Sequence, residues 1–134
     1  MTKRQLSQLY WLKKEITRYE QRLAELQQMR DHIGSSCAGS GHSGGRESRT
    51  ERLGMEIADL EAIIEAKKIQ RIHEAAVIER YIAEIPDAYT RLIFRLRYID
   101  CMSWVKIAMT LRGTTAEAAR KAATRYIDKF DEPD

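Results

Sequence analysis

The N-terminal third of the sequence repeats apolar residues at the spacing of a coiled coil. A helix expected over residues 3–33 carries them 3, 4, 3, 4 and 3 positions apart, at Leu9, Leu12, Ile16, Tyr19, Leu23 and Leu26. That spacing places these side chains along one stripe of an α-helix, the a/d seam. Charged residues fill most other positions, so the stripe is buried only when a second helix packs on it. The chain therefore needs a partner helix, from its own sequence or from another copy.

A second heptad stretch follows a segment rich in Gly and Ser. The segment reads GSSCAGSGHSGG from Gly34 and predicts a flexible linker over residues 34–47, poorly ordered across residues 39–45. The next helix is expected to begin near Ser48 or Thr50, with its stripe at Leu53, Ile57, Leu60 and Ile64. We therefore predict an antiparallel helical hairpin, a coiled coil, over residues 1–84.

Beyond Ile64 the apolar stripe rotates around the helix. Lys67 and Arg71 occupy the continuing seam positions, and apolar residues reappear displaced at Ile69, Ile72, Ala76, Ile78, Tyr81, Ile82 and Ile85. A break in the heptad has this effect. We expect the first half of this helix to pack on the N-terminal helix and the second half on the C-terminal unit. The apolar surface that a two-helix hairpin leaves exposed predicts self-association through the N-terminal helices.

Residues 85–130 predict three short amphipathic helices joined by tight turns. The first is expected to begin at Pro86 or Asp87, with Arg91, Arg95 and Arg97 mostly outward. Its expected buried face consists of Tyr89, Leu92, Ile93, Leu96 and Ile99. The second helix is expected to have Ser103 as its N-cap and to bury Trp104, Ile107, Ala108 and Leu111.

The last two helices have the spacing of a helix-turn-helix. Gly113 can end the second helix in the left-handed conformation, and Thr114 or Thr115 can cap the third at once. Alanines at 118, 119, 122 and 123 permit close packing of that third helix. The predicted fold is all-α: a long helical hairpin, a three-helix helix-turn-helix domain over residues 85–130, and an acidic tail over residues 131–134.

The charge distribution indicates a polyanionic partner for the C-terminal unit. Residues 86–127 contain eight Lys or Arg and three Asp or Glu, a net charge of +5, whereas the whole chain carries +3. Such concentration of basic residues beside a helix-turn-helix favours nucleic acid. No arrangement of residues predicts catalysis, so we expect no enzyme and no cofactor.

The cysteine and hydropathy patterns set the expected environment. Cys37 and Cys101 are too few for a disulfide framework or a zinc motif, and Cys37 with His42 does not make a metal site. No apolar run has the length of a signal peptide core or a membrane span. We expect a reduced, cytoplasmic protein with no membrane partner.

At its C-terminal end the chain resembles a known family of regulators. The segment RLIFRLRYIDCMSWVKIAMTLRGTTAEAARKAATRYI resembles region 4 of sigma-70-type transcription factors, and more closely the helix-turn-helix of ArpU-like phage transcriptional regulators. The shared pattern is an RYI segment, a short turn, Ser103-Trp104, Ile107-Ala108, Leu111, Gly113, a Thr cap and an Arg-bearing last helix. The resemblance covers about the last third of the chain.

The resemblance implies a set of DNA-binding residues. The recognition helix would begin at Thr115, and the positions that would meet base edges are Ala116, Glu117, Arg120 and Lys121. Arg120 can pair with guanine and Glu117 can accept from cytosine N4. Glu117 can equally close a capping box with Thr114. The expected phosphate contacts are Lys106, Arg112, Thr115 and Arg125.

We interpret the chain as a sequence-specific, DNA-binding transcriptional regulator of phage origin. Double-stranded DNA is the expected partner, and the helical hairpin would mediate dimerisation or contact RNA polymerase. Two alternatives are a phage small terminase-like protein that recognises packaging DNA, and a coiled-coil adaptor that binds protein and no DNA.

Overall fold

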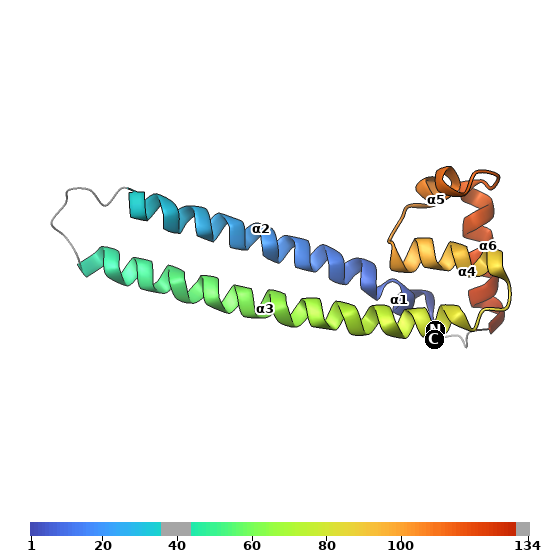
Figure 1. Cartoon of the computed structure of the whole chain (residues 1–134), viewed down its shortest axis with the longest axis horizontal. Coiled ribbons are helices and arrows are strands. Elements are labelled where there is room, and N and C mark those ends of the chain that lie inside the picture. Colours follow the sequence, from blue (N-terminus) through green and yellow to red (C-terminus); the bar gives the residue numbers. More distant parts are fainter. Residues whose placement is uncertain (36–43, 131–134) are drawn as a thin grey trace. The chain divides into compact units, whose positions relative to one another are not determined.

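The computed structural model describes residues 1–35 and 44–130, which form helices joined by turns. Its elements are α1 (Lys3–Leu6), α2 (Gln8–Ser35), α3 (Gly44–Ala83), α4 (Ala88–Phe94), η1 (Arg95–Ile99), α5 (Trp104–Leu111) and α6 (Ala116–Phe130). Two long antiparallel helices precede the shorter C-terminal ones, which confirms the predicted all-α fold (Figure 1).

The helices extend into the predicted linker from both of its ends. Helix α2 continues through Ser35 and α3 begins at Gly44, so residues 34–35 and 44–47 are helical. The remaining part of the predicted linker, over which most of the poor order was expected, lies outside the described residues. The predicted acidic tail over residues 131–134 also lies outside them.

The chain divides into two compact units, and the division falls within the long helices. The first unit contains residues 1–13 and 71–130, and the second contains Lys14–Gln70. Residues 1–13 and 71–84, assigned to the hairpin from the sequence, therefore belong with the C-terminal helices.

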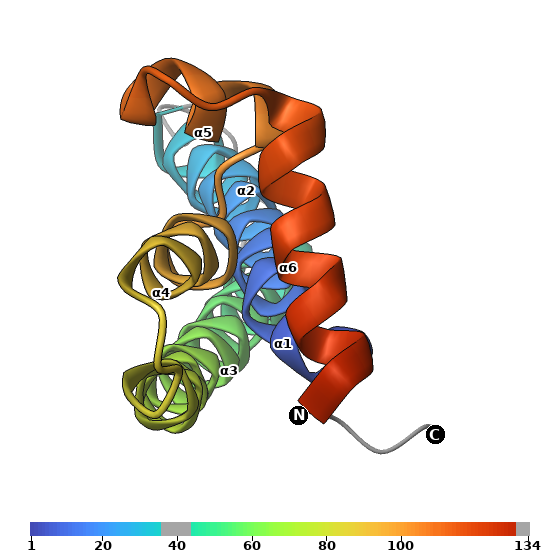
Figure 2. The ribbon, with the colours of Figure 1, turned by 90° about the vertical axis from the view of Figure 1, so that its right-hand side faces the viewer.

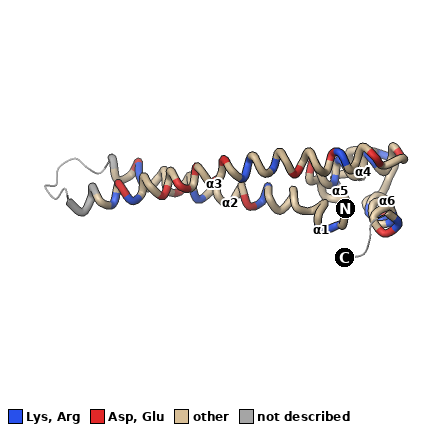
Figure 3. The backbone as a smooth tube through the Cα atoms, turned by 90° about the horizontal axis from the view of Figure 1, so that it is seen from below, with Lys and Arg blue, Asp and Glu red and all other residues tan. Residues whose placement is uncertain are grey.

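The second unit is a two-helix coiled coil built on the predicted seam. Its core contains Leu26, Ile57, Leu60 and Ile64, with Tyr19, Leu23 and Leu53 packed against it. Ion pairs cross between the helices: Lys67 Nζ lies 2.7 Å from Glu15 Oε1, and Lys68 Nζ lies 3.9 Å from Glu20 Oε1. Figure 3 marks the positions of Lys and Arg in blue and of Asp and Glu in red along the backbone of α2 and α3. Lys67 is therefore accommodated at its seam position because its ammonium group reaches Glu15 across the pair.

The first unit has a core of its own, to which both ends of the sequence contribute. It is formed by Leu6, Leu9, Ile78, Ile82, Ile85, Ile93, Phe94, Leu96, Tyr98, Ile107, Ala119, Ala123 and Ile127. The second half of α3 thus packs on the C-terminal helices through the end of the rotated stripe, whereas Ile69 and Ile72, at the beginning of that stripe, are exposed. Figure 2 shows α6 upright beside α4, which is seen end-on.

A short N-terminal helix adds a layer that the heptad pattern did not predict. Thr2 and Gln5 form a capping box, in which Thr2 Oγ1 accepts from the Gln5 amide and Gln5 Oε1 accepts from the Thr2 amide. Ser7 separates α1 from α2, so the single helix expected over residues 3–33 is interrupted. The Leu6 side chain is fully buried in the core of the first unit.

Ile93 and Leu96 are buried as predicted, but the buried face of α4 is rotated away from the rest of the predicted one. Asp87 is the N-cap, with its carboxylate accepting from the Thr90 amide at 3.0 Å, and Pro86 precedes the cap. Tyr89 and Leu92, both predicted to be buried, are more than two-fifths exposed. The residues buried from α4 and η1 are Thr90, Ile93, Phe94, Leu96 and Tyr98.

The aromatic ring of Phe94 accounts for this change of face. The ring is fully buried, and its centroid lies 5.3 Å from that of Tyr98, 5.5 Å from Tyr126 and 6.3 Å from Tyr81. A π-helical turn, η1, then follows, and the Asp100 amide donates to the Arg95 carbonyl five residues earlier. The wider turn rotates the following side chains and brings Tyr98 into the core.

Replacing Leu6 tests whether the N-terminal helix is part of the first unit's core. Leu6→Ala should lower the free energy of unfolding by about 2–5 kcal/mol, because it leaves a cavity at a fully buried position. Urea unfolding followed by the fluorescence of Trp11 and Trp104, both in the first unit, measures the loss. Met109→Ala removes an exposed side chain of the same unit and should change stability by no more than about 0.5 kcal/mol. Equal effects of the two substitutions would contradict the packing of α1.

Candidate nucleic-acid interface

Helix α5 forms as the sequence predicted. The Ser103 hydroxyl accepts from the Lys106 amide at 3.2 Å and caps the helix. Ile107 is fully buried, and Trp104, Ala108 and Leu111 are half-buried on the same face. Lys106 and the two apolar residues Val105 and Met109 are exposed on the other side. The predicted apolar face of α5 is confirmed.

A tight turn with two residues at positive φ joins α5 to α6. Arg112 has a φ of 47° and Gly113 a φ of 114°, so the backbone leaves the helix in the left-handed region. The Thr114 hydroxyl lies 2.6 Å from the Tyr89 hydroxyl, a hydrogen bond that links the turn to α4. The turn is therefore held by α4 as well as by its own backbone.

Thr115, and not Thr114, caps helix α6. The Thr115 hydroxyl accepts from the Ala118 amide at 3.0 Å, and the Ala119 amide donates to the Thr115 carbonyl. Thr114 is engaged with Tyr89, so the proposed capping box between Thr114 and Glu117 is not formed. The alternative in which Glu117 caps the helix is thus wrong, since its carboxylate has other partners.

The two faces of α6 differ sharply in composition. Ala119, Ala123 and Ile127 are buried against the rest of the first unit, and the small side chains allow the close approach that was predicted. The exposed residues include Glu117, Ala118, Arg120, Lys121, Arg125, Asp128 and Lys129. This exposed face of α6, together with Lys106 and Arg112, is called the reading face below.

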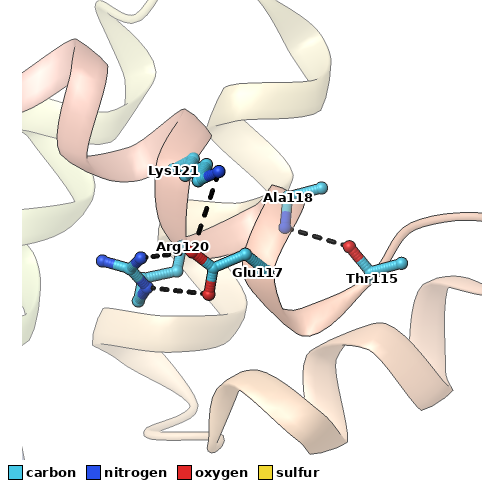
Figure 4. A network of polar contacts seen from close by, with 5 residues as sticks. All are labelled: Thr115, Glu117, Ala118, Arg120 and Lys121. Atoms are coloured by element: carbon cyan, nitrogen blue, oxygen red, sulfur yellow. Dashed lines mark hydrogen bonds and ion pairs between the residues drawn. The ribbon is translucent and has the colours of Figure 1, made fainter.

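At the N-terminal end of the reading face, one carboxylate contacts two cations (Figure 4). Arg120 donates to Glu117 through two groups: Nε to Oε2 at 3.4 Å, and Nη2 to Oε1. Lys121 Nζ lies 3.9 Å from Glu117 Oε1. The hydrogen bond from Arg120 is the main reason that the pKa of Glu117 lies below its ordinary value, and Lys121 acts in the same direction. Glu117 is therefore ionised at neutral pH.

The remaining predicted site residues lie on α5, the turn and α6. Lys106, Arg112, Thr115 and Arg125 are exposed, as phosphate contacts must be. Ala116 is half-buried at the start of α6 and exposes little surface. The fold thus brings seven of the eight predicted residues to exposed positions in the helix-turn-helix, with Ala116 partly withdrawn.

Of the three arginines expected to face outward, Arg91 and Arg97 instead bind backbone carbonyls, whereas Arg95 is exposed as predicted. Arg91 Nη1 donates to the carbonyls of Ile85 and Pro86, and is half-buried. Arg97 donates to the Met102 carbonyl, with its guanidinium carbon 4.6 Å from the centre of the Trp104 ring. Arg95 is exposed and pairs with Glu79 at 3.4 Å. The basic surface is accordingly smaller than the net charge of +5 suggested.

Sequence reasoning overlooked the far end of the reading face. Asp128 is exposed there, and its position continues the spacing of Glu117, Lys121 and Thr124 along α6. That spacing of four, three and four residues was visible in the sequence and could have added Asp128 to the residues predicted on this face. A carboxylate at this end limits how far along α6 a polyanion can be bound.

Two kinds of feature are absent from residues 1–35 and 44–130. Over these residues, no group of three or more His, Cys, Asp or Glu side chains is placed to hold a metal ion. No helix of this part of the chain is long and apolar enough to cross a membrane. Cys37 and His42 lie outside the described residues.

Comparisons of the chain with protein-family models, with curated proteins and with solved structures found no match.

Substitution of Thr115 tests the observed helix cap. Thr115→Ala should destabilise the first unit by about 0.5–2 kcal/mol, because the Ala118 amide loses its acceptor at the start of α6. Thr115→Ser keeps the hydroxyl and should retain most of the stability. Thermal unfolding followed by circular dichroism measures both variants. A cap at Thr114 would instead make Thr115→Ala and Thr115→Ser indistinguishable from the parent.

Proposed function

We propose that this chain is a non-enzymatic, sequence-specific DNA-binding regulator of transcription, similar to the ArpU-like phage regulators. The observation that carries the proposal is the reading face: exposed Arg112, Arg120, Lys121 and Arg125 beside a tight helix-turn-helix. A helix presented in this way fits the major groove of DNA, with the residues of its N-terminal turns next to the base edges. Such a protein would act in the cytoplasm on the DNA of its host cell.

The chemistry of each exposed side chain assigns it a role in this proposal. Arg120 offers parallel N–H groups that match O6 and N7 of guanine, and Glu117 can accept from cytosine N4. Lys106, Arg112 and Arg125 would contact phosphates, which orient the protein without reading sequence. The Thr115 hydroxyl accepts from the Ala118 amide and still has a hydrogen to donate to a phosphate oxygen.

A second copy of the chain would supply a second reading face. Helix α6 alone offers few base-reading side chains, because Ala116 and Ala118 have short ones and Arg125 is assigned a phosphate contact in this proposal. Apolar residues of the second unit that remain exposed include Met29, Met55, Ile63 and Ile69. Their exposure favours self-association, with contact to RNA polymerase as the other use of this surface.

The second candidate function is a protein-binding adaptor that does not bind DNA. The observation that favours it is on α5, where Val105 is 62% exposed and Met109 72% exposed, close to the charged residues of the reading face. Exposed apolar side chains in such a position are typical of protein contacts. Salt-sensitive binding of duplex DNA separates the two functions, because the adaptor should show none.

Replacing Arg120 tests the assignment of α6 as the recognition helix. Arg120→Ala should weaken binding to a duplex selected from a random pool by about 1–3 kcal/mol, and should relax specificity at one base pair. Fluorescence anisotropy at fixed salt measures the loss. Arg22→Ala is the matched control, because Arg22 also forms an exposed i,i+3 pair with a glutamate, but in the second unit. If both variants bound the selected duplex as tightly as the parent, the recognition helix would be assigned wrongly.

The oligomeric state distinguishes transcriptional regulation from DNA packaging. We expect a dimer in multi-angle light scattering, because a two-fold pair of reading faces matches a site with two half-sites. Selected duplexes should then show inverted half-sites. A closed ring of many subunits would instead support the small terminase-like alternative.

A further inference from the structure

The contact between Glu117 and Arg120 uses one particular edge of the guanidinium group. Nε and Nη2 both donate to the carboxylate, so the side-on edge of the fork is occupied (Figure 4). The end-on edge, made of Nη1 and the second N–H of Nη2, takes no part in this pair. That edge is also a parallel pair of donors and can meet O6 and N7 of a guanine.

We infer that Glu117 is a specificity-determining residue of the reading face. It binds the side-on edge of Arg120, which leaves the end-on edge oriented toward a guanine, and its negative charge opposes binding to phosphates. The inference rests on the proposed DNA-binding function. It goes beyond a contact to cytosine N4, because the carboxylate accepts from both Nε and Nη2 of Arg120. The partner that it favours is a duplex with a guanine where Arg120 enters the major groove.

The first part of this role is geometric. A free arginine side chain explores many rotamers, and ordering it on binding costs conformational entropy. Because two of its donors bind one carboxylate, the guanidinium plane is restricted in orientation in the unbound protein. A phosphate can accept from a guanidinium in many orientations, whereas guanine requires a planar, paired approach. Restricting the plane therefore favours guanine over phosphate.

The second part is electrostatic and involves Lys121 as well. Glu117 lies within 4 Å of both cations, and its charge offsets part of theirs at the N-terminal end of α6. Non-specific binding depends on cations that meet phosphates and release counterions. A carboxylate between two of these cations weakens such binding on every sequence. Cognate binding is affected less, because guanine is neutral and its pair with Arg120 depends on direction.

The pair of Glu117 and Arg120 differs in geometry from an exposed ion pair of the second unit. Arg22 and Glu25 are also three residues apart and exposed, and their contact joins Nη1 to Oε2 at 3.1 Å. That contact uses a terminal nitrogen of the guanidinium and does not involve the side-on edge. Glu117 instead faces Nε and Nη2 and is close to a second cation.

The substitution Glu117→Gln tests the inference, since it keeps size and removes the charge. We expect the affinity for a mixed-sequence duplex to rise roughly two- to fivefold, because removing one exposed charge changes a free energy by an amount of this size. The ratio of selected-duplex to mixed-sequence affinity should fall by at least the same factor. The slope of log affinity against log salt concentration should steepen by the equivalent of about one phosphate contact or more. Glu25→Gln is the matched control and should leave all three quantities unchanged.

A double-mutant cycle separates this role from a simple change of net charge. In the Arg120→Ala background, Glu117→Gln should no longer lower the affinity ratio, because the guanidinium that Glu117 holds is absent. An equal fall in that background would overturn the inference, and so would unchanged mixed-sequence binding in the single variant. If Glu117→Gln weakened only the selected duplex, Glu117 would be a cytosine contact. If the parent bound neither duplex, the proposed function itself would fail, which is a distinct result.

Discussion

The burial of α3's last turns beneath the C-terminal helices is the constraint on which the rest of the first unit depends. Helices α4 and α5 have seven and eight residues, which is too short for stability in isolation. They persist because Ile93, Phe94 and Ile107 share one core with Ile78, Ile82 and Ile85 of α3 and its following turn. Leu6 and Leu9 close this core from the N-terminal side. The position of α6 is thus set by residues from the beginning, middle and end of the sequence.

The repeating parts of the fold could be predicted from the sequence because their burial follows a regular spacing. The heptad seam, the cap at Ser103 and the apolar face of α5 depend on residues within a few turns of one another, and all are found in the structure. The buried face of α4 could be predicted only in part, at Ile93 and Leu96. Its sequence offers two apolar stripes, and packing of Phe94 against Tyr126, distant in sequence, together with the π-helical turn, decides between them.

The candidate site was predictable in its residues but not in their partners. Spacing and resemblance placed the cations on the last helix, and most of them are exposed there. The use of Arg91 and Arg97 to bind backbone carbonyls depends on turns whose geometry no periodicity describes. The same is true of Thr114, which bonds to Tyr89 and leaves the cap to Thr115. Net charge by sequence therefore overestimates the charge offered to a polyanion, because it counts cations that hold the fold together.

Under the proposed DNA-binding function, Glu117 has a position that serves folding and recognition together. It lies in the first turn of α6, where a carboxylate interacts favourably with the positive end of the helix dipole. The same end of a recognition helix is brought nearest to the DNA, where a negative charge opposes the phosphates. Loss of this carboxylate would thus weaken the helix slightly while removing a repulsion from DNA, so stability and non-specific affinity would change in opposite directions. A carboxylate that simply completed a surface ion pair would have no such opposed effects. The contacts to Arg120 and Lys121 reconcile the two requirements, because they screen the carboxylate without removing it from the helix terminus.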